Sequence, residues 1–448
     1  MNYSIYLHIP FCTHRCAYCD FNTYAGQEDM IPAYVEALTQ EIEYVGRALQ
    51  DYQTNGQSNY PTSAHTIFFG GGTPSLLSPL QFDSIFKSIR SSFVLTDDAE
   101  ITIEANPGTV SYEDLLELRR IGINRISFGV QSANVEELHM LERAHNYFDV
   151  IEAVSSARKA GFDNLNLDLI YGLPEQALQT WQTTVKRILD LHPEHISAYA
   201  LTLEHGTPFG HWSSKGLLPL PDPDLAAEMY EWASEALEAN GYFQYEISNW
   251  ARSVESRTSN VKPATFDVRP LTPAFACRHN LQYWRGLPYL AFGAGGHGYA
   301  NGYRYSNVLR IKTYIDRITN YRETSLRDPI GHHQSSNSLV SQSPVSNLSF
   351  PLSPATVNHH KQTLKDDMSE FMMTGLRLTQ EGVSADEFQS RFGTSLRDVY
   401  GKEIDDLLKV GLIESPSPSG RRARGEGEIL RLTQRGRLLG NQVFMRFV

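Results

Sequence analysis

Short apolar runs alternate with longer segments of helical periodicity along the first half of the chain. The short runs are typical of buried strands. They predict a first strand that ends at Pro10 and further strands at residues 65–69, 101–105, 124–130, 164–170 and 195–201. The longer segments place apolar residues three or four positions apart, as amphipathic helices do. We expect these helices at residues 31–49, 112–121, 135–141, 148–160, 176–191 and 221–241.

This order of strands and helices predicts an α/β fold. Six strands are expected from Tyr6 onward, and five of them follow a helical segment, as in the right-handed crossover units that build a parallel sheet. In parallel α/β folds, ligands bind beyond the carboxyl ends of the strands. Residues at these ends are therefore the first candidates for a functional site.

Three of the four cysteines follow the first strand. Cys12, Cys16 and Cys19 form a C-x3-C-x2-C pattern after Pro10, which ends the strand because proline has no N–H for the sheet. Three thiolates in one loop can hold a soft metal centre, and an iron-sulfur cluster bound this way keeps one iron without a protein ligand. Catalytic zinc sites likewise leave one position open.

The same loop is compatible with other sites. Cys16 and Cys19 have the spacing of a thioredoxin-type pair, although that pattern normally opens a helix and gives no role to Cys12. His14 can complete a Cys3His zinc site, although it lies between two of the proposed ligands. A buried thiol without a ligand is a further alternative. The spacing favours the iron-sulfur site, and the residues of the loop alone leave the alternatives open.

Other strand ends carry glycine or polar residues. The strand at 65–69 runs into the sequence GGGTP at residues 70–74, where glycine allows the backbone to approach a ligand closely. Glu104 lies at the end of the strand at 101–105, and Gln131 follows the strand at 124–130. Because the carboxyl ends of parallel strands share one edge of a sheet, we expect these residues to lie near the cysteine loop.

The second half of the chain is less regular. Residues 253–273 and 331–363 are rich in polar residues and proline, and they predict surface insertions because they cannot bury enough apolar area. Between them lies His279, close to Tyr283, Trp284 and a second glycine run. On this pattern alone, His279 is interpreted as a buried histidine that is hydrogen-bonded beside aromatic residues.

The C-terminal residues 364–448 have a helical pattern followed by short strands. The turn at residues 415–427 contains Arg421, Arg422 and Arg424, and the segment is similar to a winged-helix module. Three clustered arginines are more often a solvated loop than a phosphate contact. We therefore expect this module to serve packing and not DNA binding.

Composition narrows the range of functions. The chain has 448 residues, enough for two domains, and its 39 basic and 51 acidic residues give a net charge of -12. This balance offers no broad basic surface, so we expect no nucleic-acid partner. The clustered cysteines favour a reducing compartment, and no signal peptide or integral membrane segment is expected. These features predict a cytoplasmic protein.

The sequence YLHIPFCTHRC at residues 6–16, together with Cys19 and the GGGTP motif, resembles the radical S-adenosylmethionine superfamily, in particular its oxygen-independent coproporphyrinogen III oxidase-like branch. The resemblance covers nearly the whole chain apart from the two insertions. It implies a partial (β/α)6 radical-SAM barrel at residues 1–250, with an extension at 251–330. The segment 331–363 then links this core to a smaller helical, winged-helix-like domain at 364–448.

The resemblance also implies cofactors and their residues. Cys12, Cys16 and Cys19 would bind a [4Fe-4S] cluster whose fourth iron is chelated by S-adenosylmethionine. The residues implied to hold S-adenosylmethionine are Tyr6, Gly71, Gly72, Thr73, Glu104, Gln131, Arg143 and Asp168. Their chemistry suits the ligand, because an arginine can fork a carboxylate and an acidic side chain can accept from a ribose or an amine.

Two classes of this branch differ in function. The oxidases carry an extra N-terminal segment and a further cysteine two residues after the third, whereas here Cys19 is followed by Asp20 and Phe21. The sequence HNLQYW that begins at His279 instead resembles the haem chaperones of the HemW class, in which this histidine binds haem. Imidazole is a standard axial ligand of haem iron, and Tyr283 and Trp284 can supply flat apolar contacts. Cys277 is an alternative thiolate ligand, although a buried, inert cysteine is the safer interpretation.

The resemblance implies partners as well. A chaperone of this class would pass haem to a haem-accepting protein and receive electrons from a flavodoxin- or ferredoxin-type donor. The alternative function is an oxygen-independent coproporphyrinogen III oxidase, in which cleavage of S-adenosylmethionine starts the oxidative decarboxylation of propionates. No catalytic residue is assigned for that alternative.

Overall fold

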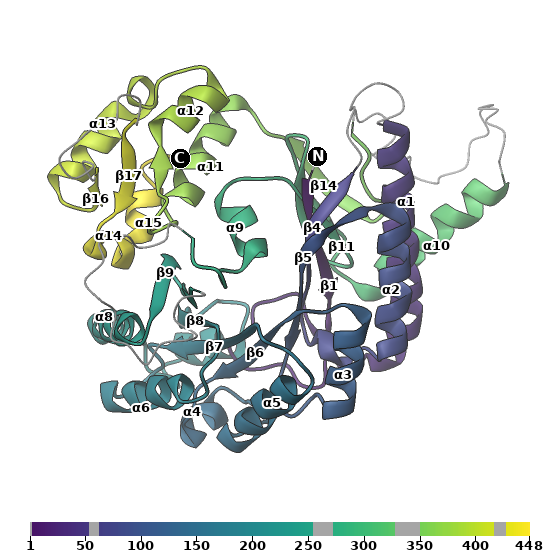
Figure 1. The fold of residues 1–448 in the computed structure, drawn as a ribbon, viewed down its shortest axis with the longest axis horizontal. Helices are drawn as coiled ribbons and strands as arrows, with labels where there is room; N and C mark the ends of the chain where they lie inside the picture. The colour runs from purple at the N-terminus through teal and green to yellow at the C-terminus, as the bar shows by residue number, and fades with distance from the viewer. Residues whose placement is uncertain (1, 53–61, 254–271, 328–349, 416–426) are drawn as a thin grey trace. The chain divides into compact units, whose positions relative to one another are not determined.

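A computed structural model describes residues 2–52, 62–253, 272–327, 350–415 and 427–448 (Figure 1). The chain forms two compact units. The first unit consists of Met1–Ser127, Ser155–Phe162 and Pro288–Lys361, and the second of Phe128–Val154, Asp163–Leu287 and Gln362–Val448. The domain boundaries predicted from the sequence remain predictions. Most of the two polar segments, and all of Arg421, Arg422 and Arg424, fall outside the described residues. For residues 350–361 the prediction of a surface insertion is wrong, because Phe350 and Leu352 are buried and residues 356–361 form a strand paired with residues 303–307.

The first unit is built on a mixed sheet. Its strands follow the order β14-β13-β12-β11-β1-β4-β5, in which β11, β1, β4 and β5 are parallel and β11 to β14 are antiparallel. The strands are β1 Asn2–Ile9, β4 Ser63–Gly71, β5 Val94–Ala105, β11 Tyr289–Phe292, β12 His297–Ala300, β13 Tyr303–Asn307 and β14 Thr356–Lys361. The helices are α1 Ile31–Tyr52, α2 Pro79–Ser92, α3 Tyr112–Ile121 and α10 Ile311–Arg327, and the strands β2 Phe11–Cys12 and β3 Tyr24–Ala25 pair separately.

The second unit carries parallel strands β7 and β8, and β10 and β9 follow β8 in antiparallel pairing. Strand β6 Arg125–Gln131 and helix α5 Tyr147–Lys159 each have some residues assigned to the first unit and some to the second. The strands are β7 Leu165–Tyr171, β8 His195–Ala200, β9 Tyr242–Glu246 and β10 Asn249–Arg252. The helices up to residue 287 are α4 Val135–Met140, α6 Leu178–Leu189, α7 Pro208–Ser214, α8 Pro223–Ala239 and α9 Arg278–Trp284.

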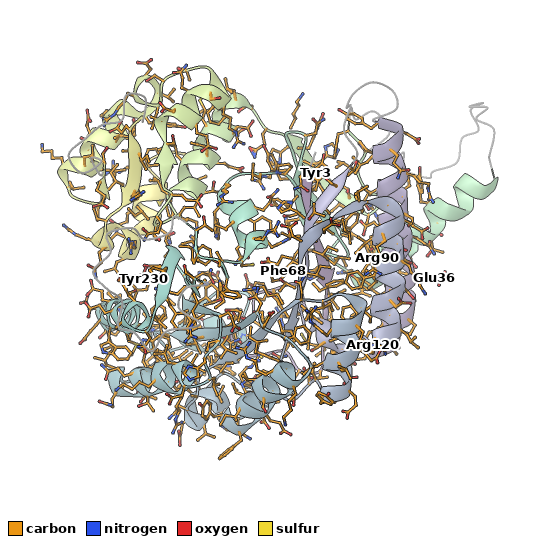
Figure 2. The ribbon with its side chains drawn as sticks, in the orientation of Figure 1. Tyr3, Glu36, Phe68, Arg90, Arg120 and Tyr230 are labelled. Carbon is orange, nitrogen blue, oxygen red and sulfur yellow. The ribbon has the colours of Figure 1, made fainter. Side chains whose placement is uncertain are left out.

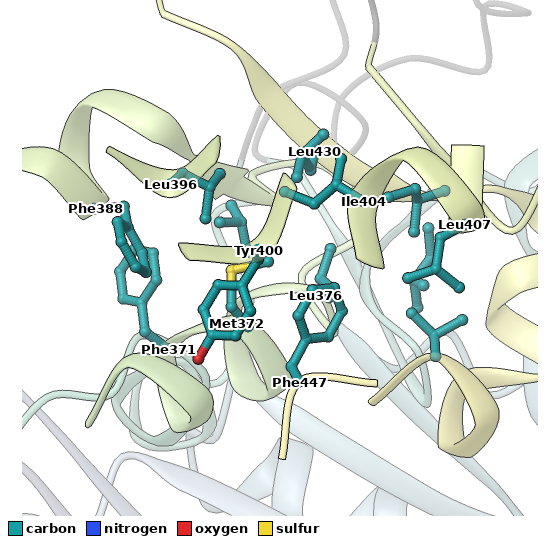
Figure 3. Close-up of a cluster of buried hydrophobic side chains, with 14 of the residues drawn as sticks. Phe371, Met372, Leu376, Phe388, Leu396, Tyr400, Ile404, Leu407, Leu430 and Phe447 are labelled. Atoms are coloured by element: carbon teal, nitrogen blue, oxygen red, sulfur yellow. The ribbon is translucent and has the colours of Figure 1, made fainter. Parts of the chain in front are cut away.

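The C-terminal part of the second unit has its own apolar core, shown in Figure 3. Its elements are α11 Leu364–Gly375, β15 Val383–Ser384, α12 Ala385–Phe392, α13 Leu396–Lys409, β16 Ile413–Glu414, β17 Ile429–Leu432, α14 Gln434–Leu438 and α15 Gly440–Phe444. Phe371, Phe388 and Phe392 pack ring against ring, with 4.7 Å between the centroids of Phe388 and Phe392. The strands form a small sheet in the order β15-β17-β16, so the predicted change from helices to short strands is confirmed.

The predicted α/β fold is confirmed. The six predicted strands correspond to β1, β4, β5, β6, β7 and β8, although β5 begins seven residues before the predicted start. The described strands form no closed barrel, as expected of a partial one. Helix α2 was not predicted, although Ser78 and Gln81 form a capping box at its start. Within the described residues, no helix has both the length and the apolar character that a membrane span requires.

A buried carboxylate holds helix α1 against the later part of the first unit. Glu41 is completely buried and accepts hydrogen bonds from the Gly293 N–H at 2.8 Å, the Asn307 amide at 2.8 Å and the Tyr314 hydroxyl at 2.6 Å. Ser353 donates a fourth hydrogen bond. Burial raises the pKa of Glu41, and the four donors act in the opposite direction. One carboxylate thus joins α1 to four residues between 293 and 353, all far from it in the sequence.

We expect Glu41→Ala to lower the free energy of unfolding by about 3–5 kcal/mol, because the substitution leaves several buried donors without an acceptor. Urea denaturation measures this change. Glu36, labelled in Figure 2, is exposed on the same helix, and Glu36→Ala should change stability by less than about 0.5 kcal/mol. Equal losses in the two variants would contradict the role assigned to Glu41.

Candidate cofactor and haem sites

The cysteine loop and the glycine run meet at the ends of two paired strands. Ile9 of β1 is in register with Gly71 of β4. Beyond this pair, the Gly72 N–H donates to the Ile9 carbonyl and the Thr73 N–H donates to the Phe11 carbonyl, each at 2.8 Å. The predicted proximity of the loop and the glycine run is therefore confirmed within the first unit.

The glycines are required by the contact between these strand ends. A Cβ on Gly72 would lie 2.5 Å from the Phe11 carbonyl oxygen. Gly71 has φ +113°, and a Cβ there would lie 2.5 Å from the His8 ring. Glycines at these positions are predicted to let a ligand approach the backbone closely. The structure adds a separate reason, which is the close packing of the chain against itself.

The three cysteines lie on one short loop, and none of them forms a disulfide. Cys12 is buried, whereas Cys16 and Cys19 are partly exposed. The Thr73 hydroxyl donates to the Cys12 sulfur at 3.6 Å, and the Cys19 N–H donates to the Cys16 carbonyl at 3.1 Å. Thr73 is itself held by the Asn106 amide at 3.1 Å. The donor set is soft and partly accessible, as thiolate ligands of an iron-sulfur cluster need to be.

The loop differs from a site preformed around one ion. Among the described residues, no three His, Cys, Asp or Glu side chains are gathered so that they could hold a single metal ion. His14, considered above as a zinc ligand, is exposed. In a four-iron cluster each cysteine binds a different iron, so the thiolates need not converge on one point.

The partly buried Tyr6 and the buried His8 form a polar link next to the loop. The Tyr6 hydroxyl is 3.0 Å from His8 Nδ1, and His8 Nε2 is 2.9 Å from the Asn22 carbonyl oxygen. Because a carbonyl only accepts, Nε2 carries the proton and Nδ1 accepts from Tyr6. Burial lowers the pKa of His8 and raises that of Tyr6, so both are neutral near pH 7. His8 and Asn22 were not assigned from the sequence.

Glu104 also belongs to this group, because its Oε2 accepts the Gly71 N–H at 3.0 Å. The first unit thus brings together the three cysteines with Tyr6, Gly71, Gly72, Thr73 and Glu104.

The remaining predicted residues belong to the second unit, and their part in a cofactor pocket stays a prediction. Gln131 ends β6 with φ 67°, a backbone conformation that few residues other than glycine adopt. Arg143 donates from Nη2 to the Gly129 carbonyl at 2.6 Å. Asp168 lies on β7 and accepts a hydrogen bond from the Asn166 amide at 2.8 Å.

His279 lies in the first turn of α9 and is 1% exposed. Its Nε2 is 2.7 Å from the Tyr283 hydroxyl one helical turn later, and the two rings meet edge to face at 83°. This geometry matches the interpretation of His279 as a buried histidine that is hydrogen-bonded beside aromatic residues. An iron that binds at Nε2 would have to replace the hydrogen bond to Tyr283.

Trp284 ends the same helix and packs within the protein. The Arg377 guanidinium lies 4.2 Å from the centre of its ring, and the indole packs against a cluster that includes Leu281 and Leu378. Arg377 also pairs with the buried Glu246 at 3.2 Å. Trp284 therefore packs beside the C-terminal segment, and contact of its ring with a macrocycle stays a prediction.

Two arginines fix the residues just after α9. Arg285 pairs with Glu381 at 2.5 Å, and the Arg391 guanidinium donates to the Gly286 carbonyl at 3.1 Å. Burial raises the pKa of Glu381, but the hydrogen bonds from Arg285 and Thr272 and the charge of Arg285 together outweigh it, so the pKa lies below its usual value. The C-terminal segment of the second unit therefore sets the position of the helix that carries His279.

Comparisons with known proteins agree with the predicted family. The model of the Radical SAM superfamily matches residues 6–188, and that of the HemN C-terminal domain matches residues 362–439. The heme chaperone HemW of Bacillus subtilis is 35% identical over 450 residues, which cover 99% of each chain. The heme chaperone HemW of Lactococcus lactis is 32% identical over 99% of this chain and 97% of its own.

Among solved structures, coproporphyrinogen III oxidase HemN from Escherichia coli has a similar fold. The TM-score is 0.71 at 21% sequence identity, over 99% of this chain and 89% of that chain. At this identity, the similarity concerns the fold alone.

We expect Gly72→Ala to lower the free energy of unfolding by about 1–3 kcal/mol, because the added methyl group meets backbone atoms that cannot move away easily. Gly401→Ala is the matched control, since Gly401 lies within α13 with open space around its Cα, and alanine there should stabilise the helix by about 0.5–1 kcal/mol. Thermal and urea denaturation measure both changes. A Gly72→Ala variant as stable as the parent protein would contradict the packing described here.

Proposed function

We propose that this chain, which belongs to the HemW family within the radical SAM superfamily, binds haem and transfers it to an acceptor protein. The observation that carries the proposal is the match to a heme chaperone over 99% of both chains. The acceptor would be a haem-binding protein, and electrons would come from a flavodoxin- or ferredoxin-type donor. The partly exposed thiols of the cysteine loop suit the reducing cytoplasm.

Cys12, Cys16 and Cys19 would hold a [4Fe-4S] cluster. When bound, this cluster supplies a one-electron centre with one iron open to the amino and carboxylate groups of S-adenosylmethionine. Thr73 supports this assignment, because its hydroxyl already donates to the Cys12 sulfur. Hydrogen bonds to cluster sulfurs are one way in which a protein sets the reduction potential.

S-adenosylmethionine would bind next to these cysteines. Gly71, Gly72 and Thr73 would face its methionine part, and Tyr6 and Glu104 support this placement because they lie at the same strand ends. The neutral Tyr6 hydroxyl would act as a hydrogen-bond partner and not as a charge. Gln131, Arg143 and Asp168 are proposed as further binding residues on the resemblance alone.

His279 would be the axial ligand of haem. Its imidazole is of the right chemical type, and its hydrogen bond to Tyr283 would hold the ring in one orientation until iron replaces the hydroxyl at Nε2. Cys277 is completely buried at the start of the same helix and would remain a packing residue.

The oxidase alternative has less support. The likeness to HemN concerns the fold, and Asp20 and Phe21 occupy the place of the further cysteine that the oxidases carry. Both residues are exposed. In the part of the chain that the structure describes, no specific observation favours porphyrinogen oxidation.

We expect His279→Ala to weaken haem binding at least about tenfold, because iron loses its protein ligand. Titration of the purified protein with haem, followed by the Soret absorbance, measures the dissociation constant. His211→Ala replaces an exposed histidine on α7 and should leave haem binding unchanged. Unchanged binding in the His279 variant would remove this residue from the haem site.

An iron-sulfur cluster gives absorbance at about 400 nm after anaerobic reconstitution. We expect Cys16→Ser to abolish this absorbance, because one iron loses its thiolate. Cys277→Ser changes a cysteine outside the loop and should retain full absorbance and iron content.

The same reconstituted protein also separates the two functions. Given coproporphyrinogen III, a reductant and S-adenosylmethionine, it should form no protoporphyrinogen. Formation of that product would contradict a protein that acts only as a chaperone.

A further inference from the structure

We propose that Asn166, His195 and Tyr245 are positioning residues that couple ligand binding at Asp168 to helix α9, which carries His279. These three residues belong to β7, β8 and β9, and no family motif named above includes them. The inference rests on the proposed function, because it takes Asp168 as part of the S-adenosylmethionine pocket and His279 as the haem ligand. It adds a physical connection between the two sites.

The connection starts at the N-terminus of α9. The Cys277 N–H, directly before the helix, donates to the Tyr245 hydroxyl oxygen at 3.2 Å. The same hydroxyl is 2.8 Å from His195 Nε2. Tyr245 therefore joins the residue two positions before His279 to a buried histidine on another strand.

The connection continues through His195 to Asp168. His195 Nδ1 is 2.6 Å from Asn166 Oδ1, and Asn166 Nδ2 donates to Asp168 Oδ1 at 2.8 Å. The bond to the carboxylate fixes which end of the Asn166 amide is the oxygen, and Ser197 also donates to that oxygen at 3.1 Å. Strand register explains the arrangement, because Asn166 pairs with His195 and Asp168 with Ser197.

With a neutral His195, the donor and acceptor of each hydrogen bond in this series follow from its partners. Since Asn166 Oδ1 only accepts, Nδ1 of a neutral His195 carries the proton and Nε2 accepts from the Tyr245 hydroxyl. Each of the four hydrogen bonds therefore has its donor on the side of α9 and its acceptor on the side of Asp168. Hydrogen bonds aligned in this way polarise one another, and the negative charge of Asp168 at the accepting end strengthens all of them.

Burial makes this series of hydrogen bonds sensitive to the charge of the Asp168 carboxylate. His195 and Cys277 are fully buried, and Asn166 and Tyr245 are 3% and 1% exposed. In such an environment, water does not replace a weakened hydrogen bond. When an amine or a ribose hydroxyl donates to Asp168, less of the carboxylate charge acts on Asn166. The hydrogen bond at the Cys277 N–H then weakens, which loosens the first turn of α9 and makes the buried His279 easier to reach.

A structural role alone would predict something different. Removal of a buried hydrogen bond lowers stability at any position, and it would affect the binding of both ligands to a similar degree. Only a coupling role predicts that the effect of one ligand on the other is lost while each ligand still binds. This effect is also reciprocal, because S-adenosylmethionine must change haem affinity by the same factor as haem changes the affinity for S-adenosylmethionine.

The test uses the full-length protein with its reconstituted cluster. Haem dissociation constants are measured by anaerobic absorbance titration with and without saturating S-adenosylmethionine. In the parent protein, we expect S-adenosylmethionine to tighten haem binding about fivefold, at the lower end of typical coupling between sites. The ratio of the haem dissociation constant without S-adenosylmethionine to the constant with it is then about five. Tyr245→Phe keeps the ring and removes the hydroxyl, and it should bring this ratio to about one while both ligands still bind.

The matched control is Tyr242→Phe. Tyr242 is completely buried on the same strand, and its hydroxyl donates to the Pro193 carbonyl at 2.7 Å, outside the chain of hydrogen bonds. This variant loses the same chemical group and should keep the fivefold ratio. His195→Gln interrupts the chain at its middle and provides the second test if Tyr245→Phe does not fold.

The outcomes separate this inference from the proposed function. Failure of the parent protein to bind haem or S-adenosylmethionine overturns the proposed function and the inference with it. Binding of both ligands with a ratio of one or less overturns the inference alone. It is also overturned if the ratio survives in both Tyr245→Phe and His195→Gln, or if Tyr242→Phe loses it to the same extent.

Discussion

The hydrogen bonds that join the end of β4 to the end of β1 are the constraint on which the first unit depends. Pro10 takes the chain out of the sheet, and the Gly72 and Thr73 N–H groups then bind the Ile9 and Phe11 carbonyls. This contact excludes a side chain at Gly72 and places the Thr73 hydroxyl on the Cys12 sulfur. The same hydrogen bonds therefore pack the two strand ends and bring the glycine run next to the cysteine loop. A change that disturbs the packing must also disturb the site.

The second unit follows a similar principle with side chains. The helix that carries His279 is held at its start by the Cys277 N–H on Tyr245 and after its end by Arg285 on Glu381. Trp284 packs under Arg377 between these two anchors. A helix of only seven residues has little stability of its own, so tertiary contacts must set its position. The position of the proposed haem ligand therefore depends on β9 and on the C-terminal segment.

Local patterns in the sequence predicted much of the fold and part of the site. Strand and helix periodicity, Pro10 and the glycine run are read from neighbouring residues, and they located β1, β4 and the cysteine loop correctly. Contacts between distant segments were not accessible in this way. Glu41 meets donors from residues 293 to 353, and Asn166, His195 and Tyr245 come from three strands. One available signal was missed, because Asn166 and Asp168 are polar residues on one face of an otherwise apolar strand.

The central claim is that the cysteine loop and the glycine run form one site, in which an iron of a [4Fe-4S] cluster accepts S-adenosylmethionine. Electron paramagnetic resonance of the reduced, reconstituted protein tests it directly, because ligand binding to a cluster iron changes the g values of the cluster. We predict a [4Fe-4S]⁺ signal whose g values shift when S-adenosylmethionine is added, and a loss of that shift in Gly72→Ala. A signal that S-adenosylmethionine leaves unchanged in the parent protein would contradict it.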